Sequence, residues 1–69
     1  MTPKEFKATR RDLGLSLAEV ADAFRVESDR QVRRWETGER DIPGPAQVLM
    51  DLLGTHPDLL EEIEFDYRR

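Results

Sequence analysis

The stretch LGLSLAEVADAFRVESDRQVRRWETG, residues 13–38, decides the fold of this chain. Ser16 precedes Glu19 by three residues, and Ser28 precedes Gln31 by three, so each serine begins an S-x-x-E/Q capping box. In such a box the serine oxygen accepts from the amide three residues on, and the Glu or Gln reaches back to the serine amide. The stretch therefore predicts two short helices in succession, joined by a tight turn.

Similar signals predict three further helices. Thr2, Pro3 and Glu5 repeat the capping device at the N-terminus, and Gly14 follows as a C-terminal stop. Prolines at positions 45 and 57 suit the first turn of a helix, where a missing amide hydrogen costs nothing. The expected helices run over residues 3–12, 17–24, 29–37 and 45–53, with a fifth starting at residue 57 in the C-terminal segment 55–69.

Apolar residues at helical spacing predict which faces of these helices are buried. Trp35, three residues after Val32, is assigned to the core, because an indole at the end of a short amphipathic helix is more often packed inside than used for stacking. The expected core comprises Phe6, Leu13, Val20, Ala21, Phe24, Val32, Trp35, Ile42, Val48, Leu49, Leu52 and Leu53.

Length and composition exclude several classes of protein. With 69 residues, 38% of them apolar, the chain is expected to be a single domain over 1–69 with one small core. The absence of cysteine and the single histidine, His56, argue against a disulfide framework or a metal site, so no cofactor is expected. No nucleophile elbow, phosphate loop or paired-histidine motif predicts an enzyme. Without an apolar run of membrane length or an export signal, the chain is expected in the cytoplasm, with no membrane partner.

The net charge of −4 is unevenly distributed. Residues 1–40 carry nine Lys or Arg against eight Asp or Glu, whereas residues 41–69 carry two against seven. Four arginines lie in and just after the expected helix 29–37: Arg30, Arg33, Arg34 and Arg40. A basic face on an acidic body favours one oriented contact with DNA, the alternative being an ordinary solvated face.

Three short motifs resemble the Cro/C1-type (XRE-like, lambda-repressor-like) helix-turn-helix family: LGLS at 13–16, AEVA at 18–21 and VRRWETG at 32–38. The resemblance covers about residues 6–54. It implies an all-α, five-helix lambda-repressor-like bundle with a helix-turn-helix motif, a homodimer and a palindromic operator. It also implies a buried ion pair between Arg10 and Glu36, the alternative being two exposed charges.

The chain departs from the family pattern in three respects. Leu17 stands where a polar residue, usually glutamine, begins the first motif helix, so its DNA contact is lost or supplied elsewhere. Arg25 stands where the turn normally has a glycine, which takes left-handed backbone angles without strain. The turn up to Val32 is also one residue longer. We expect the extra residue to spread the turn, relieve that strain and shift the angle of the second motif helix.

The second motif helix presents candidate base-reading residues opposite Val32. By resemblance these are Asp29, Arg30 and Arg34, and arginine pairs bidentately with guanine. Arg33 has two equally weighted roles: contact with a base, or an ion pair with Asp29 four residues earlier.

Phosphate contacts are expected from residues at helix ends and in the following loop. Amides at a helix start and cations beside it attract anions. The candidates are Ser16, Ser28, Thr37 and Arg40.

The C-terminal segment 55–69 has more apolar residues than so small a bundle is expected to bury. An apolar stripe with an acidic rim is typical of a partner surface. A two-fold dimer contact is therefore predicted here and along the end of the helix 45–53, through Leu59, Leu60, Ile63, Phe65 and Tyr67.

The sequence thus predicts a transcriptional regulator that binds double-stranded DNA sequence-specifically. A compact dimeric repressor of phage or mobile-element type, Cro-like or anti-CRISPR-associated, is the leading interpretation. The alternative is a protein-interaction module on the same fold, such as an antitoxin. Salt separates the two, because DNA binding weakens steeply as salt rises.

Overall fold

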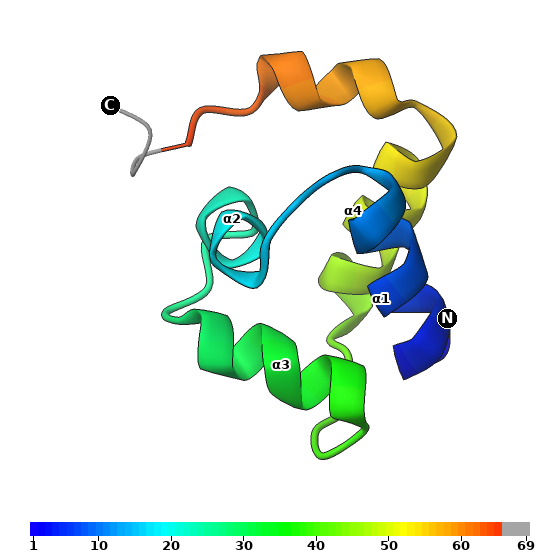
Figure 1. Cartoon of the computed structure of the whole chain (residues 1–69), viewed down its shortest axis with the longest axis vertical. Coiled ribbons are helices and arrows are strands. Elements are labelled where there is room, and N and C mark those ends of the chain that lie inside the picture. The colour runs from blue at the N-terminus through cyan, green and yellow to red at the C-terminus, as the bar shows by residue number, and fades with distance from the viewer. Residues whose placement is uncertain (66–69) are drawn as a thin grey trace.

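The computed structural model describes residues 1–65 and contains four α-helices and one 3-10 helix in that range (Figure 1). The α-helices are α1 (Pro3–Asp12), α2 (Leu17–Ala23), α3 (Asp29–Thr37) and α4 (Gly44–Thr55), followed by the 3-10 helix η1 (Pro57–Glu62). No strand occurs in this range. The predicted all-α bundle is confirmed. Tyr67, assigned to the dimer contact, lies outside the described residues.

The starts of α1 and α2 are fixed by the predicted local signals. The Oγ atoms of Thr2 and Ser16 accept from the amides of Glu5 and Glu19, and both glutamates accept from the amide of their capping residue. Each start therefore satisfies two backbone donors within its own first turn.

The start of α3 differs, and the capping box predicted at Ser28 is wrong. Ser28 makes no side-chain cap hydrogen bond, and its backbone φ is −154°, against −88° for Thr2 and −79° for Ser16. The chain therefore enters α3 in a more extended conformation than it enters α1 or α2, and the Ser28 hydroxyl accepts no bond from the amide of Gln31. That amide donates to the Ser28 carbonyl oxygen at 3.2 Å.

Phe6 of α1 is the centre of the core. It is fully buried, and its ring meets Trp35 and Phe24 edge to face, at centroid distances of 5.8 and 6.2 Å. T-shaped pairs of this kind contribute beyond their buried area. Ile42, between α3 and α4, is buried as predicted. The largest fully buried side chains are Phe6, Val20, Val32, Met50 and Leu53.

Helix α4 buries Leu53 as predicted and half-buries Leu49, but the prediction is wrong for Val48 and Leu52. Val48 is 70% exposed and Leu52 45% exposed, whereas Ala46, Met50 and Leu53 are buried. A helix presents only one side to its core, and Val48 and Leu52, four residues apart, share the opposite side. The predicted stop at residue 54 is also wrong, since α4 continues to Thr55.

The C-terminal segment lies over the bundle. The prediction of an exposed apolar stripe in this segment is therefore wrong. The chain after α4 crosses back toward α2 as η1 and the residues that follow it (Figure 1). Phe65 is buried in the core cluster, and Leu60 and Ile63 pack against that cluster while Leu59 is half-buried. A 3-10 helix in place of the expected α-helix brings these residues onto their own domain, which leaves little apolar surface here for a partner.

Candidate nucleic-acid interface

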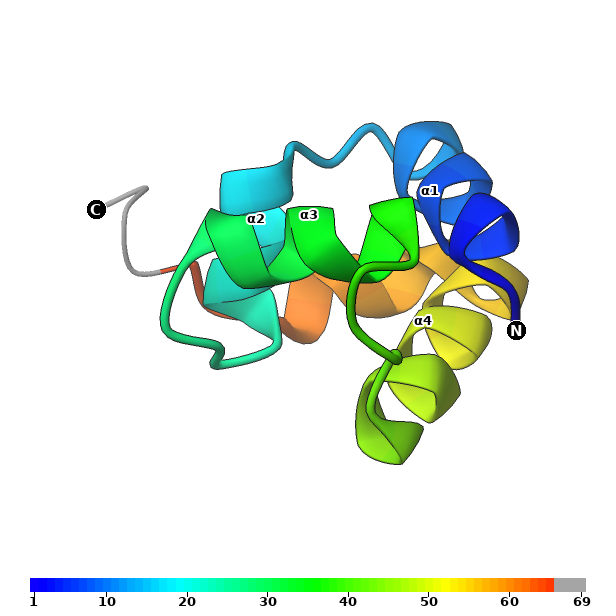
Figure 2. The ribbon, with the colours of Figure 1, turned by 90° about the horizontal axis from the view of Figure 1, so that it is seen from below.

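Helix α3 lies at the edge of the bundle with one face outward. Figure 2 looks onto α3, which crosses in front of α2 and η1. Val32 and Trp35 hold its inner face in the core. Arg30 and Arg33 are on the outer face and are exposed. The helix therefore presents cations in the position from which a motif helix enters the major groove.

The turn between α2 and α3 is strained at Arg25. This residue has φ of 59°, in the left-handed region that favours glycine. The expectation that the extra residue relieves the strain is therefore wrong. The guanidinium compensates by donating to the carbonyl oxygens of Asp22 and Glu64, which ties the turn to the C-terminal segment.

A buried ion pair fixes the position of α3. Arg10 Nε donates to Glu36 Oε2 at 2.6 Å and Arg10 Nη2 to Glu36 Oε1 at 3.1 Å. Arg10 Nη1 also donates to the carbonyl oxygen of Leu15 at 2.8 Å. The two side chains are 11% and 6% exposed. Arg10 thus joins α1, the loop before α2 and the end of α3, and sets the two motif helices relative to each other.

The charged residues on the exposed side of α3 differ in whether they form ion pairs. Arg34 forms an ion pair with Glu39, Nε to Oε2 at 3.2 Å, with side-chain exposures of 40% and 66%. The ion pair considered between Asp29 and Arg33 is absent among residues 1–65. Within residues 1–65, Arg30 and Arg33 therefore have no ion-pair partner on the outer face. Arg34 is already paired with the carboxylate of Glu39.

Sequence reasoning missed Glu39. It reaches Arg34 because Gly38, at φ of 83°, reverses the chain after α3. No helical spacing links residues 34 and 39, so the only available signal was the glycine stop itself.

The candidate phosphate contacts are unequal. The Ser16 oxygen caps α2, so its hydroxyl hydrogen remains for an acceptor. Thr37 donates instead to the Arg34 carbonyl oxygen at the end of α3. Arg40 is exposed, and its amide donates to the same carbonyl oxygen. Ser28 is half-buried at the start of α3.

Leu17 explains one departure from the family pattern. It is half-buried and packs against the core cluster. An apolar residue at the start of α2 therefore adds core contact at the position where the family pattern has a polar residue.

Other kinds of site find no support in the described range. Within residues 1–65 there is no group of three or more His, Asp or Glu placed to hold a metal ion. None of the described helices has the length and apolar character to cross a membrane.

Comparison with known protein families gives a match over most of the chain. The model of a family described as "Helix-turn-helix domain" matches residues 4–63. No curated protein was found to match the chain. The matched range contains α2, α3, α4 and η1 and all of α1 except Pro3.

Proposed function

The chain belongs to the helix-turn-helix domain family, and from this premise we propose that it is a sequence-specific, double-stranded DNA-binding transcriptional regulator. The observation that carries the proposal is the outer face of α3. There Arg30 and Arg33 are exposed and unpaired within the described chain, on a helix held rigidly by the buried pair of Arg10 and Glu36.

The proposed mechanism places α3 in the major groove. Arg30 and Arg33 donate to O6 and N7 of guanine, each contact contributing about 1 to 3 kcal/mol of discrimination. Arg34 reaches a base only after leaving Glu39, which costs little because exposed ion pairs are weak. Asp29, exposed in the first turn of α3, accepts from cytosine N4. Ser16 and Arg40 contact phosphates on either side.

We further propose that the protein acts in the cytoplasm as a dimeric repressor of phage or mobile-element type, blocking a promoter by occupying it. Because Phe65 is buried within its own domain, the dimer contact is placed on α4. Val48 and Leu52 form the exposed apolar stripe there, and a second copy related by a two-fold axis covers it. Two such protomers read a palindromic operator with half-sites one helical turn apart.

Selection from a random duplex library at physiological salt tests the proposal. Enrichment of a two-fold symmetric motif containing guanines in each half-site is expected. Arg30→Ala should change the selected sequence, whereas Arg40→Ala, the matched control, should weaken binding to all sequences alike. Failure to enrich any motif would contradict the proposal and favour the antitoxin-like interaction module.

A further inference from the structure

Helix α1 has three exposed cations that the proposed contact with α3 does not use: Lys4, Lys7 and Arg11. At about 100° per residue, the three side chains fall within an arc of roughly 60°. The acidic residues of α1, Glu5 and Asp12, lie outside this arc, and Asp12 borders the groove described below. No ion pair involves these three cations within residues 1–65.

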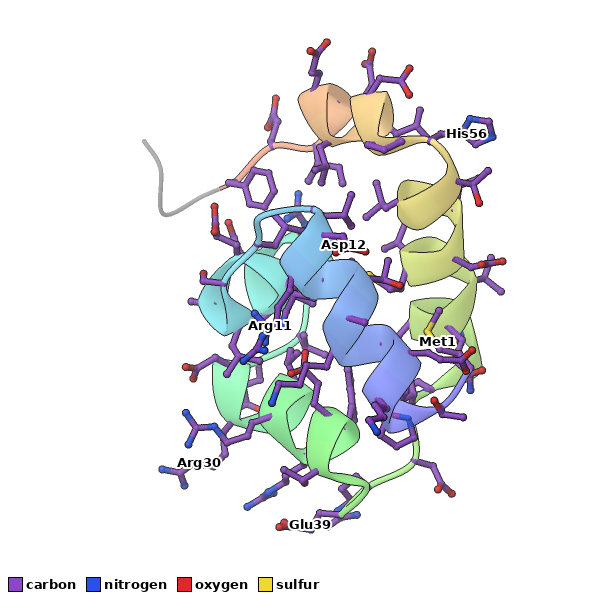
Figure 3. All side chains as sticks on the ribbon, turned by 45° about the vertical axis from the view of Figure 1, so that its right-hand side comes forward. Met1, Arg11, Asp12, Arg30, Glu39 and His56 are labelled. Atoms are coloured by element: carbon purple, nitrogen blue, oxygen red, sulfur yellow. The ribbon has the colours of Figure 1, made fainter. Side chains whose placement is uncertain are left out.

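The stripe lies beside α3. Arg10, adjacent to it on the helix, pairs with Glu36, and the Pro3 side chain lies 3.8 Å from where a Cβ on Gly38 would be. Figure 3 shows Arg11 on the same side of the molecule as Arg30, with His56 at the opposite corner.

An open groove follows the stripe. Its lining includes Pro3, Lys4, Lys7, Ala8, Arg11 and Asp12 along α1, with Glu36 contributed by α3. Ala8 is small and exposed, so a ligand can approach the helix between the cations. The Glu36 carboxylate does not repel an anion here, because both of its oxygens accept from Arg10.

We propose that Lys4, Lys7 and Arg11 bind the sugar-phosphate backbone of the duplex beyond the base pairs read by α3. This inference rests on the proposed function. From Lys4 to Arg11 the helix rises by about 10 Å. A duplex strand carries a phosphate for about every 3.4 Å of its axis, so a stripe of this length can reach more than one phosphate. The contact adds affinity and orientation without adding sequence preference.

The test compares two variants of equal net charge. Lys7→Gln/Arg11→Gln removes two cations from the stripe, and Thr55→Glu/His56→Glu adds two negative charges at the distant end of α4. Binding to the selected duplex is measured from 0.05 to 0.5 M salt, and circular dichroism checks each fold. In the Lys7/Arg11 variant the binding constant should fall less steeply with salt. The magnitude of the slope of log K against log salt should decrease by about 1.8 per protomer, with the selected sequence unchanged.

The control variant should keep the wild-type slope. If the wild type binds the duplex and the Lys7/Arg11 variant has the same slope, this inference is overturned but the proposed function is not. A wild type that binds no duplex would overturn the proposed function and this inference with it. Lys4→Gln/Lys7→Gln, with both changes on the exposed face, repeats the measurement should the first variant fold poorly.

Discussion

Helix α1 meets its two neighbours in opposite ways. Against α3 it adds charge, through the buried pair of Arg10 and Glu36, to the apolar contact of Phe6 with Trp35. Against α4 it uses close approach, because a Cβ on Gly54 would lie only 2.9 Å from Thr9 Cγ2. The first contact depends on two partners of opposite charge, and the second depends on an absent side chain.

The two contacts have different roles. The ion pair favours one arrangement of the helices, and the contact at Gly54 lets two helices pack closely. A buried ion pair contributes little net stability over an apolar pair, but it strongly disfavours any arrangement that separates its charges. Close helix contact tolerates sliding but not added volume. The ion pair thus adds a constraint of charge on the motif helices, whereas the close contact with α4 is a constraint of shape.

The largest expected effect comes from breaking the charged contact. Glu36→Gln leaves the Arg10 guanidinium buried without its anion and should lower the free energy of unfolding by about 3 to 5 kcal/mol. Urea denaturation at pH 7 measures the loss. The double variant Arg10→Met/Glu36→Leu should recover most of it. A loss of less than about 1 kcal/mol in Glu36→Gln would show that the pair is not decisive.

Adding a methyl group to the contact between α1 and α4 should have a smaller effect. Gly54→Ala gains helix propensity but forces Thr9 to shift, for a net destabilisation of about 1 to 3 kcal/mol. Placed on a Thr9→Ala background, the same change should become neutral or stabilising, because the clash is removed. Thermal denaturation of the four proteins in this double-mutant cycle measures the coupling. Additive effects would refute the role of close approach.

A change in the turn between α2 and α3, which lies away from both contacts of α1, gives a reference value for the two larger effects. Arg25→Gly removes left-handed strain of about 1 kcal/mol and also removes hydrogen bonds to the carbonyl oxygens of Asp22 and Glu64. The two effects oppose each other, so stability should change by less than about 1 kcal/mol, as measured by urea denaturation. A change as large as that of Glu36→Gln would mean that the turn positions α3 as strongly as the ion pair does.

The smallest effect is expected at the exposed start of α1. The backbone amide of Thr2, and secondly its side chain, lower the pKa of Glu5 below the ordinary value of 4.5. A lowered folded pKa stabilises the fold above the unfolded value, and this stabilisation is lost as the pH falls from 4.5 through the folded pKa. The stability of Glu5→Gln should therefore depend less on pH in that window than that of the wild type. Denaturation at pH 3 to 7 checks the difference, and parallel profiles would contradict it.

Local rules predicted the parts of the fold that local chemistry determines. The starts of α1 and α2 follow from residues three apart, and the stop at Gly38 follows from its left-handed backbone. The cap at Ser28 failed because the preceding turn, with Arg25 in the left-handed region, sets its backbone angles. A four-residue pattern contains no information on that turn.

Burial was harder to predict where apolar residues surround a helix. In α4 they occupy several sides, so the sequence could not tell that Met50 faces the core and Val48 faces outward. Phe65 was assigned to a partner because its own docking depends on η1 folding back over the bundle. For the site, the family resemblance implied the pair of Arg10 and Glu36, but the contact of Arg34 with Glu39 depends on loop geometry.

The contacts of α1 also constrain when the protein can fold during synthesis. Helix α1 has ten residues, fewer than the roughly 12 to 15 needed for marginal stability in isolation. Both of its neighbours come later in the chain, and at 5 to 20 residues per second about 2 to 9 s separate Thr9 from Gly54. For part of that interval α1 can dock on α2 and α3, but its contact with α4 has to wait for Gly54. The contacts of α1 are therefore completed only when most of this domain has been synthesised after it.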